Sequence, residues 1–261
     1  NSGDGLKGPW IEASGQVGSE SFRSAQVNAG QKWASGFGVN ASTEHMQTRG
    51  FNALNPVQRP DTNTDRDGYS RQSDAVNLSQ EFDSGRVGLM LRETHATVQY
   101  DSQWGPANQV DESKSVLRNA LLNATYKASK ELQWDVSVGQ QEDKLNAALT
   151  AYPYYVNSQS KTSAIGAVWA LWPNHALTSG YENTRQKIAS DTEYKPTERS
   201  VNSWRLGYQG KLEKQQWQLN IRQDQYSDFG NVTHGKLSAK WAPHPQWLMR
   251  GGWSTGFRAP A

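Results

Sequence analysis

Apolar and polar side chains alternate along most of this sequence. In residues 132–139 the apolar Leu132, Trp134, Val136 and Val138 are separated by polar residues or glycine. Residues 217–222 and 236–241 repeat the alternation, and residues 37–41, 87–91 and 203–208 follow it less regularly. A period of two predicts β-strands with one apolar and one polar face. We expect about thirteen strands and find no long segment with a helical period.

The connections between these expected strands fall into two length classes that alternate along the chain. Short ones lie at residues 31–33, 83–85, 129–131, 173–175, 212–215 and 243–246, and long ones at 46–70, 101–114, 142–160 and 190–200. In an up-and-down meander, alternate connections lie at opposite ends of the sheet. Outer-membrane barrels have this arrangement, with tight turns on the periplasmic side and long loops outside. The pattern predicts an all-β, antiparallel up-and-down transmembrane β-barrel, with a soluble β-sandwich or propeller as the alternative.

The composition favours the barrel. Only 35% of the 261 residues are hydrophobic, although 11 are Trp and 10 are Tyr. A soluble core of this size needs more apolar residues, whereas a membrane barrel needs them only on its outward face. The sequence lacks an apolar run of about 18 residues, which excludes a membrane-spanning helix. A net charge of +2 without a dense cluster of Lys and Arg predicts no nucleic-acid partner.

One expected long loop is rich in oxygen-bearing side chains. Its segment DTNTDRDGY, residues 61–69, carries Asp61, Asn63, Asp65 and Asp67 at alternate positions. Calcium takes six to eight oxygen ligands, and a short acidic loop can provide several of them. Asp and Asn also favour ordinary turns, because their side chains bond the nearby backbone. Local composition therefore leaves a cation site and a plain polar turn both open.

The next expected loop on the same side of the meander is also acidic. Tyr100 and Asp101 end a strand there, and Asp111 lies further along the loop. Carboxylates on adjacent loops repel one another, and a divalent cation would relieve the repulsion while ordering both loops. We therefore favour a two-loop site for a divalent cation over the alternative, in which the carboxylates of both loops are simply solvated and screened.

Four aromatic residues stand in the expected long loops, away from the strand ends where interfacial aromatics occur. They are Trp104, Tyr152, Tyr154 and Tyr155. Exposed aromatic side chains suit contact with a large, partly apolar ligand, although packing of one loop against another is the alternative. We expect these residues to contact the ligand.

Catalytic chemistry finds little support in the sequence. The five His residues are scattered and have no metal-ligand spacing, and the Gly-x-Ser-x-Gly motif of hydrolases is missing. With no Cys there is also no thiol nucleophile or disulfide framework. We expect the protein not to be an enzyme.

Several motifs resemble those of a known family. The segment WSTGFRAP, residues 253–260, resembles the Gly-Phe-Arg-Ala-Pro stretch of TonB-dependent outer-membrane receptors. RGFNALNP at residues 49–56, DRDGYSRQS at 65–73 and VQYD at 98–101 are similar in order and spacing to the cobalamin-receptor branch of that family. The resemblance extends, with gaps, over almost the whole chain.

The resemblance implies active import through a barrel of 22 strands, with a plug inside the barrel and energy from the TonB complex. It also implies calcium ions that order the loops after the early barrel strands. By position, the residues matched to calcium ligands are Asp61, Asp65, Asp67, Tyr100, Asp101 and Asp111. The expected partners are the TonB complex through a plug, outer-membrane lipid, and cobalamin or another large metal chelate.

Two alternatives to a cobalamin receptor stay open. Receptors for ferric siderophores or haem share the barrel and differ in the loops, and a soluble β-rich carbohydrate-binding or structural protein could use its aromatics as stacking platforms. An open sheet edge is not tolerated in lipid. We therefore expect residues 1–261 to be part of a larger barrel, without its plug domain and C-terminal strands.

Overall fold

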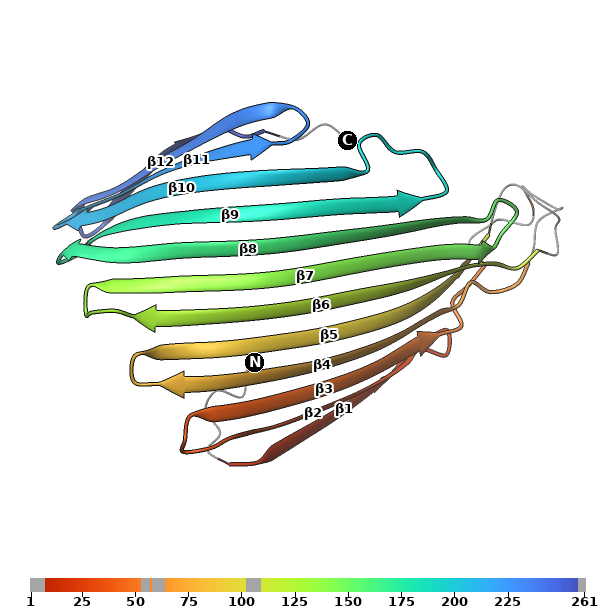
Figure 1. The fold of residues 1–261 in the computed structure, drawn as a ribbon. Coiled ribbons are helices and arrows are strands. Elements are labelled where there is room, and N and C mark those ends of the chain that lie inside the picture. The colour runs from red at the N-terminus through yellow and green to blue at the C-terminus, as the bar shows by residue number, and fades with distance from the viewer. Residues whose placement is uncertain (1–7, 53–56, 58–63, 102–108, 258–261) are drawn as a thin grey trace.

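The structure, a computed structural model, describes residues 8–52, 57, 64–101 and 109–257 (Figure 1). These residues form one antiparallel sheet of 13 strands that follow one another in chain order. The strands are β1 (Trp10–Val17), β2 (Arg23–Lys32), β3 (Phe37–Thr48), β4 (Tyr69–Phe82), β5 (Gly85–Tyr100), β6 (Asp111–Lys127), β7 (Leu132–Leu149), β8 (Tyr154–Trp172), β9 (His175–Ser190), β10 (Glu198–Leu212), β11 (Gln215–Tyr226), β12 (Gly230–His244) and β13 (Trp247–Ser254). The predicted all-β meander and its strand number are confirmed. None of the described residues forms a helix long and apolar enough to cross a membrane.

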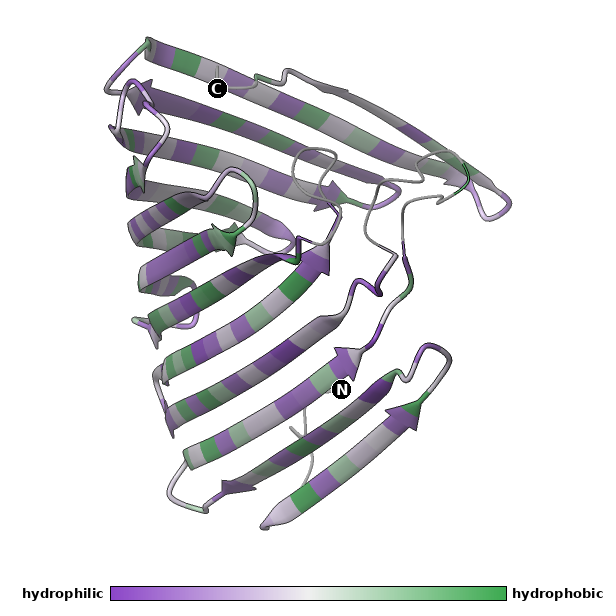
Figure 2. Ribbon diagram, turned by 90° about the vertical axis from the view of Figure 1, so that its right-hand side faces the viewer, coloured by the Kyte–Doolittle hydropathy of each residue, from purple (hydrophilic) through white to green (hydrophobic). Residues whose placement is uncertain are grey.

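The sheet is curved and open, with β1 and β13 at its two edges (Figure 2). Directly paired residues on neighbouring antiparallel strands project to the same face, so the register assigns each side chain to a face. Among the described residues other than glycine, the buried ones all share one face. They are Ser73, Asp111, Ala147, Ser203 and Asp224. Side chains crowd together on the inner side of a curved sheet. This largely polar face is therefore the concave one.

The convex face carries an apolar band. Val39, Leu78, Leu89, Leu122 and Val138 form a continuous row of direct partners across five strands. The neighbouring row on the concave face is Ser79, Gly88, Asn123 and Ser137. Val138 is 51% exposed and Leu122 is 49% exposed, so this band is open to its surroundings. An apolar outer face and a polar inner face are what a transmembrane barrel requires.

Most of the strands are longer than the roughly ten residues that a tilted strand needs to cross a bilayer. The strands range from 8 residues in β1 and β13 to 19 in β8. A strand of 19 residues spans about 60 Å, roughly twice the hydrocarbon thickness of a bilayer. The middle strands therefore extend well beyond the apolar band.

The long-loop prediction for residues 142–160 is wrong. Strand β7 continues to Leu149 and β8 begins at Tyr154, which leaves a connection of four residues, 150–153. Residues such as Glu142, Asp143, Asn157 and Ser158 are polar on both faces of this hairpin, so the segment lacks the alternation that marks a strand in a membrane. Hydrogen bonding to the neighbouring strands nevertheless extends the sheet there.

The connections lie at two ends of the sheet as predicted. Residues 33–36, 83–84, 128–131, 173–174, 213–214 and 245–246 form the tight-turn end. Residues 18–22, 49–68, 101–110, 150–153, 191–197 and 227–229 connect strands at the opposite end, which we call the loop end. The long connections 49–68 and 101–110 leave the sheet side by side, because β3, β4, β5 and β6 are consecutive neighbours.

Candidate metal centre at the loop end

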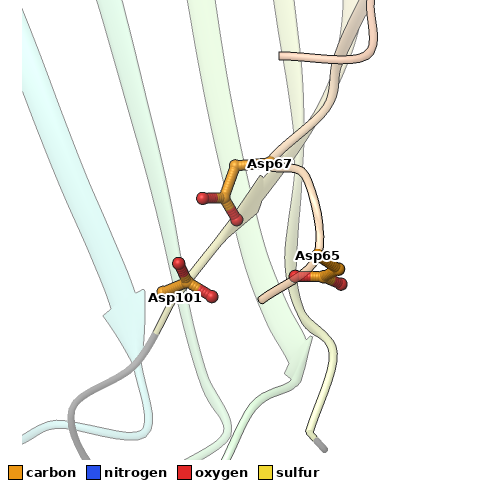
Figure 3. Close-up of side chains that lie close together, drawn as sticks. All are labelled: Asp65, Asp67 and Asp101. Carbon is orange, nitrogen blue, oxygen red and sulfur yellow. The ribbon is translucent and has the colours of Figure 1, made fainter. Parts of the chain in front are cut away.

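Three of the predicted cation ligands meet at the loop end. Asp65 and Asp67 lie just before β4, and Asp101 follows β5 directly (Figure 3). Because β4 and β5 are antiparallel, with Tyr69 opposite Val98, the start of one lies beside the end of the other. One carboxylate oxygen from each of the three aspartates lies within 4.8 Å of those of the other two.

Hydrogen bonds hold the connection between β3 and β4, residues 49–68, against the end of β5. We call this connection the first loop, and residues 101–110 the second loop. The Gly68 N–H donates to Oε1 of Gln99 over 3.0 Å, and the Gln99 N–H donates to the Gly68 carbonyl over 2.8 Å. A Cβ on Gly68 would lie 2.7 Å from Oε1 of Gln99, so a larger residue at this position would displace the Gln99 side chain from this hydrogen bond. These contacts hold Asp67, which precedes Gly68, close to Asp101, which follows Gln99 by two residues.

The other side of the first loop is fixed at Gly50. This residue has a φ of 63°, in the left-handed region that favours glycine. A Cβ at Gly50 would collide with the carbonyl oxygen of Asp67. The Asp67 N–H also donates to the Phe51 carbonyl over 3.3 Å. The two limbs of the loop therefore approach each other closely where the carboxylates gather.

Arg66, the basic residue between Asp65 and Asp67, forms an ion pair with another part of the chain. Nη1 of Arg66 lies 2.5 Å from Oε2 of Glu20, in the connection between β1 and β2. The Arg49 N–H donates to the Glu20 carbonyl over 2.9 Å. These contacts tie the long loop to the first hairpin as well as to β5.

Tyr100 and Asp111 lie next to the three aspartates. They are direct partners at the ends of β5 and β6, so their side chains share the concave face. Asp111 is only 4% exposed, and its Oδ1 and Oδ2 of Asp101 are both buried from solvent. Buried carboxylate oxygens are costly unless compensated. The second loop thus contributes shielded carboxylates beside the more exposed Asp65.

The donor chemistry of this cluster fits a hard cation. Carboxylate oxygens are the ligands that calcium and magnesium prefer, and calcium tolerates the irregular geometry that two loops provide. A phenol oxygen from Tyr100 is compatible with the same chemistry. The predicted ligand Asp61 lies outside the described residues. Of the six predicted ligands, five therefore lie at or beside one place.

The predicted ligand-contacting aromatics do not form a single loop surface. Tyr152 stands in the four-residue turn and is 71% exposed. Tyr154 and Tyr155 belong to β8, where successive side chains project to opposite faces. Tyr154, opposite Ala147, shares the concave face, whereas Tyr155 lies on the convex one. Their expected position in a long loop is wrong for Tyr154 and Tyr155, and Trp104 lies outside the described residues.

Gln99 and Gly50 are parts of the site that the sequence did not indicate. Gln99 stands directly before the predicted pair Tyr100 and Asp101, yet a lone Gln in an alternating segment carries no signal of a tie between loops. Its role follows from the pairing of β4 with β5.

A curved meander with a polar concave face, an apolar convex face and long loops at one end defines the wall of an outer-membrane barrel. The family comparison agrees with this. Residues 12–261 match the family described as TonB dependent receptor-like, beta-barrel, and the chain belongs to it. Barrels of this family lie in the bacterial outer membrane, and its members are transport receptors rather than enzymes. Among curated proteins, none matches the chain significantly.

Solved structures show the same fold at low sequence identity. The siderophore receptor PirA from Acinetobacter baumannii matches with a TM-score of 0.79 and 11% identity, over 98% of this chain and 44% of that one. PirA from Pseudomonas aeruginosa matches with 0.75 and 12%, over 97% and 43%. The FrpB iron transporter from Neisseria meningitidis, F5-1 variant, matches with 0.76 and 13%, over 98% and 47%. The chain thus spans less than half the length of these structures.

Proposed function

We propose that this chain forms part of an active-transport receptor in the bacterial outer membrane that takes up cobalamin. Uptake would draw energy from the TonB complex through a plug inside the barrel. The external loops would be ordered by calcium and would contact the ligand. The observation that carries the proposal is the convergence of Asp65, Asp67 and Asp101 from two loops that are similar to those of cobalamin receptors.

Calcium has a physical role in this proposal. Like charges gathered at the loop end disfavour a compact arrangement of the two loops, and a divalent cation removes that penalty. With the cation bound, the loops would present one fixed surface to a large ligand. A fixed surface binds more tightly than a mobile one, because less conformational entropy is lost on binding.

The direct test uses the full-length receptor in detergent. Calcium titration by calorimetry should give a binding heat, and cobalamin affinity should fall when a chelator removes calcium. Replacing both Asp65 and Asp101 with Ala should abolish the heat and weaken cobalamin binding. If calcium produces no heat in the wild-type receptor, the calcium part of the proposal is wrong. If cobalamin does not bind in calcium, the ligand assignment is wrong.

A receptor for a ferric siderophore or haem is the second candidate. It is supported by the solved structures of similar fold, whose names identify siderophore receptors and an iron transporter. The same receptor preparation can be titrated with ferric siderophores and haem beside cobalamin. Saturable binding of one iron chelate, with none of cobalamin, would select this candidate. Membership of the receptor family favours both over a soluble carbohydrate-binding or structural protein.

A further inference from the structure

Two basic residues lie directly opposite each other on the convex face. Lys161 of β8 is the direct partner of Arg185 of β9. Lys161 is also the direct partner of Gln140, which follows Val138 of the apolar band by two positions and therefore shares its face. Both basic side chains are exposed. We call Lys161 and Arg185 the basic pair.

Basic residues nearby on the same face are paired with acids, unlike the basic pair. Nζ of Lys144 lies 3.0 Å from Oε1 of Glu142, and Nζ of Lys187 lies 2.6 Å from Oε1 of Glu198. Within the part of the chain that the structure describes, neither member of the basic pair forms an ion pair or a side-chain hydrogen bond. The pair lies on the outer side of the sheet, between β7 and β10, where neither a plug inside the barrel nor strands added beyond β1 or β13 would supply an acid.

The position of the basic pair along its strands places it beside the headgroups of the outer leaflet. Tyr181 of β9 is the direct partner of Ile165 and of Trp204, and the ring centroids of Tyr181 and Trp204 lie 4.5 Å apart. Tyr and Trp on a lipid-facing surface mark the boundary between hydrocarbon and headgroups. Lys161 and Arg185 lie four residues nearer the loop end than Ile165 and Tyr181. That is about 13 Å along strands tilted by about 40°, or about 10 Å further out, a distance over which long basic side chains reach back.

We propose that the basic pair binds an outer-leaflet lipid whose headgroup carries phosphate groups. The two cations would supply charge-assisted hydrogen bonds to the phosphates, and the acyl chains of the lipid would lie against the apolar convex face below them. Like charges directly opposite each other on neighbouring strands are destabilising, and a bound phosphate would remove that repulsion. The proposal uses the place of the family in the outer membrane and does not depend on which ligand the loops take.

The test uses the full-length receptor in neutral detergent, with lipid A, a glycolipid that carries phosphate groups on its sugars, as the probe. Native mass spectrometry measures the fraction of receptor with bound lipid as the lipid concentration rises. We expect lipid A to bind more tightly than zwitterionic phosphatidylcholine, with an affinity that falls as the ammonium acetate concentration rises. Lys161→Gln together with Arg185→Gln should weaken lipid A binding about thirtyfold, because each basic residue near an anionic lipid surface contributes roughly a factor of five.

The matched control removes two cations from the opposite face. Lys211 of β10 and Lys240 of β12 are both direct partners of Gln216, so they share a face. Lys211 lies an even number of positions from the buried Ser203 in the same strand, which places both lysines on the concave face. Lys211→Gln together with Lys240→Gln makes the same change in net charge where no outer-leaflet lipid reaches, and should change lipid A affinity less than about twofold.

Two further arms separate charge from structure and lipid from free phosphate. Lys161→Arg together with Arg185→Lys keeps both charges and should retain the affinity. Pyrophosphate lacks acyl chains to lie on the apolar face, so it should displace lipid A only at about a hundredfold higher concentration or more. The proposal is overturned if lipid A binds no more tightly than phosphatidylcholine, if the two glutamine double variants have equal effects, or if pyrophosphate competes at the concentration of lipid A. Calcium and cobalamin titrations of the same variants report separately on the proposed function and should be unchanged.

Discussion

Replacing Asp101 with Asn should have opposite effects on the loops with and without calcium. The substitution keeps the size of the side chain and one oxygen while removing a charge from the cluster with Asp65 and Asp67. If the three carboxylates hold a cation, calcium affinity falls. Without calcium, the same change relieves repulsion between the two loops and makes their closed arrangement more stable.

The size of this effect follows from the geometry. For charges within 4.8 Å of each other, Coulomb's law gives a repulsion of at least about 0.9 kcal/mol per pair in water and about 3.5 kcal/mol at an effective dielectric constant of 20. Asp101 takes part in two of the three pairs, so its neutralisation relieves roughly 2 kcal/mol when solvent screening dominates. We take the attraction to calcium that the variant loses to be of similar size. Each 1.4 kcal/mol of lost binding free energy lowers the calcium affinity about tenfold. We expect calcium affinity to fall between about tenfold and a hundredfold.

Two measurements on the full-length receptor together test this. Calorimetry measures the calcium affinity, and amide hydrogen exchange of residues 64–68 and 99–101 measures how stable the closed loops are. In chelator the Asp101→Asn variant should exchange more slowly than the wild type in these segments. In calcium the order should be reversed, because only the wild type gains the full protection of the bound ion.

The control is Asp83→Asn, which makes the same charge change in the tight turn before β5, at the other end of the same hairpin. It should leave both measurements unchanged. The reasoning is refuted if Asp101→Asn exchanges faster than the wild type in chelator, since the carboxylates would then stabilise the loops without an ion. Equal calcium affinity in the variant and the wild type would refute it as well.

Three further predictions concern the wall and the first loop. Val138→Arg, on the convex apolar band, should lower the free energy of unfolding in lipid vesicles by about 2–4 kcal/mol; Ser137→Arg on the concave face should cost clearly less, and equal costs would reverse the assignment of faces. Gly50→Ala should weaken calcium binding and speed exchange in the first loop, because its φ of 63° and the facing carbonyl leave no room for a Cβ; an unchanged affinity would show that the loop does not need this close approach. Asp224→Ala removes the ion pair with Arg222 and should lower the free energy of unfolding in detergent by about 1–3 kcal/mol. The loss is less than for a fully buried ion pair because the Arg222 side chain is 41% exposed. An unchanged free energy of unfolding in urea would contradict this.

In the strands whose apolar and polar residues alternate clearly, the sequence by itself determined which residues share a face. Alternation is a local property, since successive side chains of any extended strand point to opposite sides. The apolar set of Leu132, Trp134, Val136 and Val138 could therefore be assigned to one face from the sequence alone, and the structure confirms it. The number of strands and the alternate ends of their connections followed from the same pattern.

Where the strands end, and which residues lie opposite each other on neighbouring strands, depended on the tertiary structure. Residues 142–149 are polar on both faces and carry no strand signal, yet pairing with β6 and β8 extends β7 through them. The pairing of β4 with β5, and the hydrogen bonds between Gly68 and Gln99, bring Asp67 to Asp101 across more than thirty residues of chain. Hydrophobic periodicity reports the environment of one strand, whereas a site formed by several strands exists only once their register is set.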